Sequence, residues 1–152
     1  MDITGTFRFD HPQPVVWAVL THPDSIAAAL PGVQTLTPIP GQSLAWTAQI
    51  SLAFIAINAE FSGEIRLTDL RELSEFRLSV SSGSGDSRLT GSALITLTPV
   101  EDSPAHTLLT YSGEAELTGK FASFPPAIVK SVVMMLVRQY FMTLSHQVGG
   151  AN

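Results

Sequence analysis

The sequence predicts an α+β fold in which one curved antiparallel sheet wraps around a long C-terminal helix. Most of residues 35–117 alternate between polar and apolar side chains, which is the pattern of strands with one buried face. Two short apolar helical segments follow the first strand. Residues 127–147 contain no Gly or Pro and repeat their apolar side chains at helical spacing. A one-sided sheet and a single long helix bury their apolar faces best against each other.

The N-terminal segment predicts a half-buried strand and then two short helices. Residues 3–9 place an apolar residue or glycine at every second position, with polar residues between them. Pro14 is well placed to begin a helix, and the helical pattern stops before residues 22–23. Asp24 or Ser25 is expected to cap the second helix.

The middle of the chain predicts a meander of strands joined by turns. The expected strands are residues 36–39, 43–54, 55–70, 75–81, 89–99 and 107–117. Pro- and Gly-rich segments at residues 40–42, 82–86 and 101–104 form the turns. In the third strand Phe61, Ile65 and Leu67 share one face, whereas Glu60 and Glu64 share the other. This pattern is typical of an antiparallel sheet with one face in water.

The C-terminal helix carries an apolar stripe and a narrow polar line. The stripe contains Val129, Val132, Val133, Leu136, Val137, Tyr140 and Leu144, and the polar line contains Ser131, Arg138 and Ser145. Met134, Met135, Phe141 and Met142 widen the stripe. We therefore expect apolar contacts nearly all around this helix.

Composition limits the function classes that the chain can serve. Its 152 residues are 45% hydrophobic and 14% charged, whereas an ordinary soluble domain is roughly 25% charged. This length predicts one domain over residues 1–148 and a disordered tail over residues 149–152. Because Cys is absent, disulfides, thiol nucleophiles and Cys-based metal sites are excluded. The net charge of −5 argues against nucleic-acid binding.

Charge and hydropathy also bear on location. The longest apolar run after the start, residues 132–137, is short of the roughly 20 residues that cross a bilayer, and no signal peptide is recognisable. We therefore expect a cytoplasmic protein. Lys120, Lys130 and Arg138 fall in a C-terminal segment without acids. They either complement a helix dipole or favour contact with an acidic partner or, peripherally, with the inner face of the membrane.

Several segments, in their order and spacing, resemble a known family. They are the Pro-led helix with Trp17, LPGV at residues 30–33, FSGEIRLTDL at 61–70, SGSG at 82–85 leading to GSALI at 91–95, and GKFA at 119–122. Together they resemble the CoxG subunit of carbon monoxide dehydrogenase, a branch of the START-like (SRPBCC, polyketide-cyclase-like) superfamily, over about residues 1–148. The resemblance implies a helix-grip fold with an apolar cavity between sheet and helix. It also implies a non-enzymatic accessory protein of a molybdenum hydroxylase, which recruits that enzyme to the membrane or carries a lipid or quinone.

No catalytic, metal or cofactor site is predicted. His11, His22 and His106 are expected in surface loops or turns, His146 is expected near a helix end, and no pair has the spacing of metal ligands. The strand carboxylates, Glu60, Glu64, Glu114 and Glu116, fall on the outer face of the sheet.

The apolar surface is instead the candidate site, as a pocket for a hydrophobic small molecule. Gly63, Gly91, Ala93, Gly113 and Ala115 on the inward face leave space under the helix, unless bulky neighbours fill it. The expected lining is Trp17, Phe61, Ile65, Ile95, Tyr111, Val133, Leu136 and Tyr140. The hydroxyl of Tyr111 or Tyr140 is expected to orient a polar headgroup.

Two alternatives stay open. One is an enzyme of the cyclase or dehydratase type acting on an apolar substrate, which requires an acid or base facing inward. The other is a docking surface for a partner or a membrane, on the helix face or on the apolar hairpin around Leu52, Phe54 and Ile55. Carbon monoxide dehydrogenase or another molybdenum hydroxylase is the expected partner.

Overall fold

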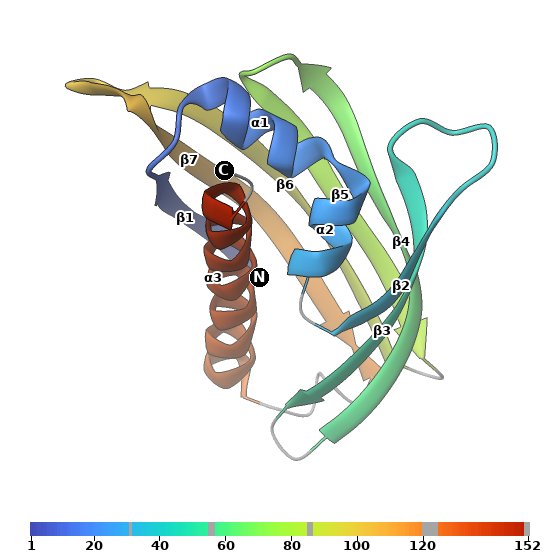
Figure 1. Ribbon diagram of the computed structural model, residues 1–152. Coiled ribbons are helices and arrows are strands. Elements are labelled where there is room, and N and C mark those ends of the chain that lie inside the picture. Colours follow the sequence, from blue (N-terminus) through green and yellow to red (C-terminus); the bar gives the residue numbers. More distant parts are fainter. Residues whose placement is uncertain (31, 55–56, 85–86, 120–124, 151–152) are drawn as a thin grey trace.

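The predicted α+β architecture is confirmed. The computed structural model describes residues 1–30, 32–54, 57–84, 87–119 and 125–150. Its elements are β1 (Asp2–Phe9), α1 (Gln13–Thr21), α2 (Pro23–Ala29), β2 (Val33–Pro38), β3 (Ala45–Phe54), β4 (Ile57–Arg71), β5 (Glu75–Ser84), β6 (Ser87–Val100), β7 (Ser103–Thr118) and α3 (Pro126–Gly150). The strands form one seven-stranded sheet that curves around α3 (Figure 1).

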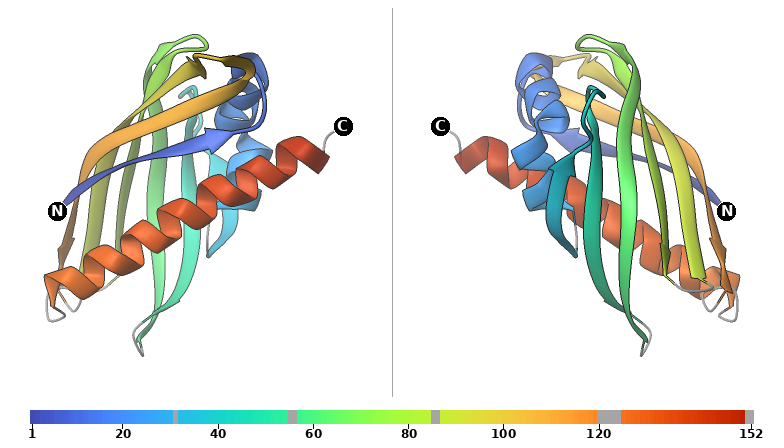
Figure 2. Two further views of the ribbon diagram at one scale, coloured as in Figure 1. Left: turned by 90° about the vertical axis from the view of Figure 1, so that its left-hand side faces the viewer. Right: turned by 90° about the vertical axis from the view of Figure 1, so that its right-hand side faces the viewer.

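The sheet is a meander closed by the N-terminal strand. Its strand order is β1-β7-β6-β5-β4-β3-β2, and every neighbouring pair is antiparallel. The connection through α1 and α2 therefore carries the chain from one edge of the sheet to the other. Both short helices lie against the C-terminal half of α3 and cover one end of the curved sheet (Figure 2).

Strand alternation places the core as predicted. Ile65 and Leu67 in β4 are buried, whereas Glu60 and Glu64 are exposed. The same alternation buries Ile3 and Phe9 in β1, Ile95 and Leu97 in β6, and Leu109 and Tyr111 in β7. The apolar faces of all these strands thus point towards α1, α2 and α3.

The cap of α2 differs from the prediction. His22, rather than Asp24 or Ser25, is the N-cap residue, and its Nδ1 accepts the backbone N–H of Asp24 at 3.2 Å. A ring nitrogen can satisfy an unpaired helical N–H just as a side-chain oxygen does. Asp24 lies in the first turn, where its negative charge complements the helix dipole.

The expectation that apolar contacts nearly surround α3 is wrong. Val129, Tyr140, Phe141 and Leu144 are buried, but Ile128, Met135 and Met142 are 45%, 59% and 44% exposed. The three exposed side chains repeat at intervals of seven and therefore form one apolar line along the helix. The cause is geometric, because α3 crosses the open side of the sheet and the sheet covers only one of its faces (Figure 2).

α3 is also slightly longer than expected. It runs to Gly150, past the predicted end at residue 147, and residues 151–152 of the expected tail lie outside the described residues. By length and composition alone, Pro126–Gln147 is apolar enough to cross a membrane, contrary to the expectation from its short apolar run. Core helices of soluble proteins meet the same criterion, so the criterion does not assign a span.

Candidate ligand-binding site

An apolar cavity of about 210 Å³ lies between the inner face of the sheet and α3. It is lined by Ile3, Leu30, Leu78, Val80, Ala93, Ile95, Tyr111, Leu136, Val137, Tyr140 and Phe141. The sheet supplies the floor through β1, β5, β6 and β7, and α3 supplies the roof. Apart from the two phenol hydroxyls, these side chains are hydrocarbon.

The small residues of the inner face act differently from the prediction. Ala93 lines the cavity, as its size allows. A Cβ on Gly113 would lie 2.6 Å from Cα of Ala93, and a Cβ on Gly63 would lie 2.6 Å from Cβ of Ser82. These two glycines therefore let neighbouring strands approach each other and do not open space for a ligand.

The structure brings part of the predicted lining together. Ile95, Tyr111, Leu136 and Tyr140 all line the cavity. Three others do not: Trp17 packs edge-on against Phe76 with ring centroids 5.7 Å apart, Ile65 is buried in the core, and Val133 packs against the core. The side chains of Phe61, Leu52 and Phe54, and the whole of Ile55, lie outside the described residues. Ligand binding by the four lining residues stays a prediction.

Sequence reasoning missed much of the lining. The residues that it did not name as lining are Ile3, Leu30, Leu78, Val80, Ala93, Val137 and Phe141. Leu78 and Val80 alternate with Arg77 and Ser79, so the two-residue period of the strand was a usable signal for them. Leu30 had no such signal, because it follows α2 and reaches the cavity only through the packing of that helix.

Two buried phenols line the cavity with their rings, and the described part of its wall exposes no polar atom. Burial raises the pKa of both Tyr140 and Tyr111 above its ordinary value, because an ionised phenolate would lose its hydration. Both hydroxyls therefore stay protonated at neutral pH. Phe141 contacts both rings, with its ring centroid 5.3 Å from that of Tyr140 and 5.4 Å from that of Tyr111. Neither hydroxyl is exposed on the cavity wall, so the expectation that Tyr111 or Tyr140 orients a headgroup stays a prediction.

A second hollow, which we call the groove, runs between β1 and α3 and has a volume of about 690 Å³. It is lined by Gly5, Thr6, Phe7, Arg8, Tyr111, Ser131, Met134, Met135, Arg138 and Phe141. Tyr111 and Phe141 belong to the lining of both the cavity and the groove. The groove is mixed in character, since two guanidinium groups share it with aromatic and thioether side chains.

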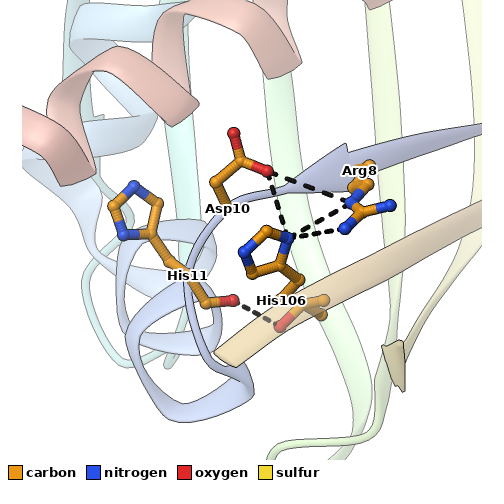
Figure 3. A network of polar contacts seen from close by, with 5 residues as sticks. Arg8, Asp10, His11 and His106 are labelled. Atoms are coloured by element: carbon orange, nitrogen blue, oxygen red, sulfur yellow. Dashed lines mark hydrogen bonds and ion pairs between the residues drawn. The ribbon is translucent and has the colours of Figure 1, made fainter. Parts of the chain in front are cut away.

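A polar network contacts Arg8, one of the residues that line the groove (Figure 3). An Nη of Arg8 lies 2.7 Å from Nδ1 of His106, which must accept because arginine only donates. Asp10 lies 3.9 Å from Nε of Arg8 and 3.3 Å from Nδ1 of His106. His106 was expected in a turn, but it lies on β7 and so ties β7 to the end of β1.

The buried Thr107 completes this connection. Its hydroxyl donates to the backbone carbonyl of His11 at 2.8 Å (Figure 3). Within the described ranges, no group of three His, Asp or Glu residues is arranged to hold a metal ion. The network links the end of β1 to β7.

Comparison with known proteins identifies the family. Residues 5–149 match the model of the family of the CoxG subunit of carbon monoxide dehydrogenase. The chain belongs to the CoxG family. None of the curated proteins is a significant sequence match.

Solved structures show the fold of this CoxG-family chain. A conserved protein from Geobacillus kaustophilus superposes with a TM-score of 0.92 at 22% identity, covering 99% of this chain and 97% of that chain. A START superfamily protein from Mycobacterium smegmatis gives 0.72 at 11% identity, covering 99% of both chains. A protein from Thermus thermophilus gives 0.71 at 16% identity, covering 100% of this chain and 99% of that chain. The helix-grip, START-like fold is thus shown, and with the CoxG family it supports a hydrophobic-ligand-binding fold.

Among the described residues, the acid–base groups nearest the two hollows are His106 and Asp10, which contact Arg8 of the groove but do not line it. Glu60, Glu64, Glu114 and Glu116 are exposed. The side chains that line the cavity and the groove include no Asp, Glu or His. An enzyme of the cyclase or dehydratase type would need such a group within reach of its substrate.

Proposed function

We propose that this CoxG-family protein binds a hydrophobic small molecule, a lipid or a quinone, in the cavity under α3. In this proposal it acts without catalysis of its own, as an accessory protein that carries this molecule for, or recruits, a molybdenum hydroxylase such as carbon monoxide dehydrogenase. The observation that carries the proposal is the cavity, whose wall is entirely apolar among the described residues.

The chemistry of the cavity favours a hydrocarbon or a ring over water. A water molecule needs two to four polar partners, and the described wall of this cavity exposes none. Burying apolar surface contributes about 25 cal/mol per Å², so an apolar group gains affinity from every contact with the wall. At about 210 Å³ the cavity suits one ring or a short chain segment rather than a whole lipid.

Filling the cavity tests the proposal. Purified protein is incubated with a lipid extract, repurified and extracted with solvent, and any bound molecule is identified by mass spectrometry. We expect wild type to retain a hydrophobic molecule, and Ala93→Leu and Val137→Phe to lose it, because both side chains line the cavity. Ala28→Leu is the matched control, since Ala28 is exposed on α2. Retention of nothing by wild type, or equal retention by all variants, would contradict the proposal.

The partner is tested separately. We expect a molybdenum hydroxylase to be captured by the wild-type protein and lost with Phe54→Asp and Ile55→Asp, if the apolar hairpin is the contact. Thr47→Asp is the control, because Thr47 is exposed on β3 away from that hairpin. If the hairpin variants capture the molybdenum hydroxylase as well as wild type does, the hairpin is not the contact.

A further inference from the structure

The cavity and the groove are adjacent chambers. Tyr111 from β7 and Phe141 from α3 contribute to the lining of both. On the cavity side the wall is hydrocarbon, whereas on the groove side Thr6, Ser131 and two arginines add polar atoms. Polarity therefore increases from the cavity outward along one continuous path of lining residues.

The polar end of this path is cationic. Arg8 and Arg138 line the groove, one from β1 and one from α3, and its described lining contains no acid. Arg8 meets Asp10 only at 3.9 Å, and the Asp10 side chain is mostly exposed. In the part of the chain that the structure describes, Arg138 forms no ion pair. Both guanidinium groups thus keep N–H donors free for an added anion.

The apolar part of the groove connects the arginines to the cavity. Phe7, Met134 and Phe141 line the same hollow as the guanidinium groups. The rings of Phe7 and Phe141 lie 5.8 Å apart, and Phe7 and Met134 both pack against the core. A chain that extends from an anionic group at the arginines would lie along these side chains towards Tyr111.

We propose that the groove binds the anionic headgroup of an amphiphile, a carboxylate or a phosphate, between Arg8 and Arg138. This inference rests on the proposed function, because the chain of the amphiphile points towards the cavity. Guanidinium groups suit this task, since their planar N–H donors pair with two oxygens of a carboxylate or phosphate at once. Arg8 is already oriented for it by its contact with His106.

Three amphiphiles that share one alkyl tail and differ only in the headgroup test the inference. Binding of decanoate, decyl phosphate and decanol is measured by calorimetry, so that the tail is constant and only the headgroup changes. We expect the two anionic probes to bind more tightly than decanol. The tighter-binding of the two shows whether the groove prefers a carboxylate or a phosphate. Arg138→Gln and Arg8→Gln should each weaken the anionic probes about fivefold, since the pairs are partly exposed, and leave decanol unchanged.

Lys130→Gln is the matched control. It removes one positive charge from an exposed position of α3 that does not line the groove. We expect it to leave all three affinities unchanged. The inference is overturned if Lys130→Gln weakens the anionic probes as much as Arg138→Gln does, or if the arginine variants weaken decanol equally.

The cavity variant separates this inference from the proposed function. If Ala93→Leu weakens all three probes while the arginine variants affect only the anionic ones, both proposals hold. If the anionic probes depend on the arginines but not on Ala93, the headgroup site stands and the proposed cavity function fails. If all three probes bind equally and depend only on Ala93, the headgroup inference fails and the cavity function stands.

Discussion

The ring centroids of Tyr111 and Phe141 lie 5.4 Å apart, and this pair forms the common wall of the cavity and the groove. Tyr111 comes from β7 and Phe141 from α3, so the pair also joins the sheet to the helix that covers it. Because aromatic pairs add stability beyond their buried area, the wall between the two hollows contributes to the packing of α3 as well as to binding.

The ring of Tyr111 needs a glycine beside it. Gly5 in β1 pairs with Tyr111 in β7, and a Cβ on Gly5 would lie 2.6 Å from Cζ of the ring. Gly5→Ala should displace the ring and lower the free energy of unfolding by about 1–3 kcal/mol, measured by urea denaturation. Gly83→Ala is the control, because its nearest neighbour would be 3.6 Å away. If both substitutions change the free energy of unfolding equally, the ring of Tyr111 moves aside at no extra cost.

The buried phenol of Tyr140 predicts sensitivity to alkaline pH. Burial raises its pKa, so above pH 10 the unfolded chain loses this proton while the native state still holds it. The stabilising contribution is thus full below about pH 10 and decreases as the pH rises above it, by up to about 1.4 kcal/mol per pH unit. Urea denaturation between pH 9 and 11 should show a shallower decrease for Tyr140→Phe than for wild type. Identical slopes would mean that Tyr140 ionises as easily in the native state as in the unfolded chain.

Two neighbouring residues on β7 should differ in what they contribute to stability. Thr107 is fully buried and donates to the carbonyl of His11, so Thr107→Val leaves a carbonyl without its partner and should cost about 1–3 kcal/mol. His106→Ala removes only partly exposed contacts with Arg8 and Asp10 and should cost less than about 1 kcal/mol. Chemical denaturation measures both, and a larger loss for His106→Ala would reverse this order.

Substitutions on the two faces of α3 should change the stability of the fold to very different extents. Leu144 is fully buried, so Leu144→Ala should destabilise the fold by about 2–5 kcal/mol. Met135 is 59% exposed, and Met135→Gln should change stability by less than about 0.5 kcal/mol. A thermal unfolding midpoint lowered as much by Met135→Gln as by Leu144→Ala would restore the expectation of apolar contacts all around the helix.

Periodicity predicts which face of an element is apolar, and for the strands this correctly predicts which side chains point inward. Ile65 lies inward and Glu64 outward because successive strand side chains alternate, which depends on nothing outside the strand. Whether an inward-facing side chain is packed in the core or lines a cavity is a different property, which periodicity does not predict. Ile65 and Ile95 both face inward, but only Ile95 lines the cavity, because neighbouring strands and α3 decide where space remains.

The same limit explains the errors on the helices. Met135 and Met142 belong to an apolar pattern, yet the shape of the sheet leaves their side of α3 uncovered. His22 acts as a cap through its Nδ1, a use of histidine that residue type alone does not indicate. Arg8 and Arg138 are far apart in sequence, and only the packing of α3 beside β1 brings them to one groove.

Methyl NMR during titration with a hydrophobic ligand tests the central claim most directly. The methyl groups of Ala93, Leu136 and Val137 line the cavity, whereas that of Ala28 is exposed on α2. Saturating wild-type protein with decanol should shift the three cavity signals and leave Ala28 unchanged. Shifts confined to Ile128, Met135 and Met142 on the exposed side of α3, with the cavity signals unmoved, would contradict binding inside the fold.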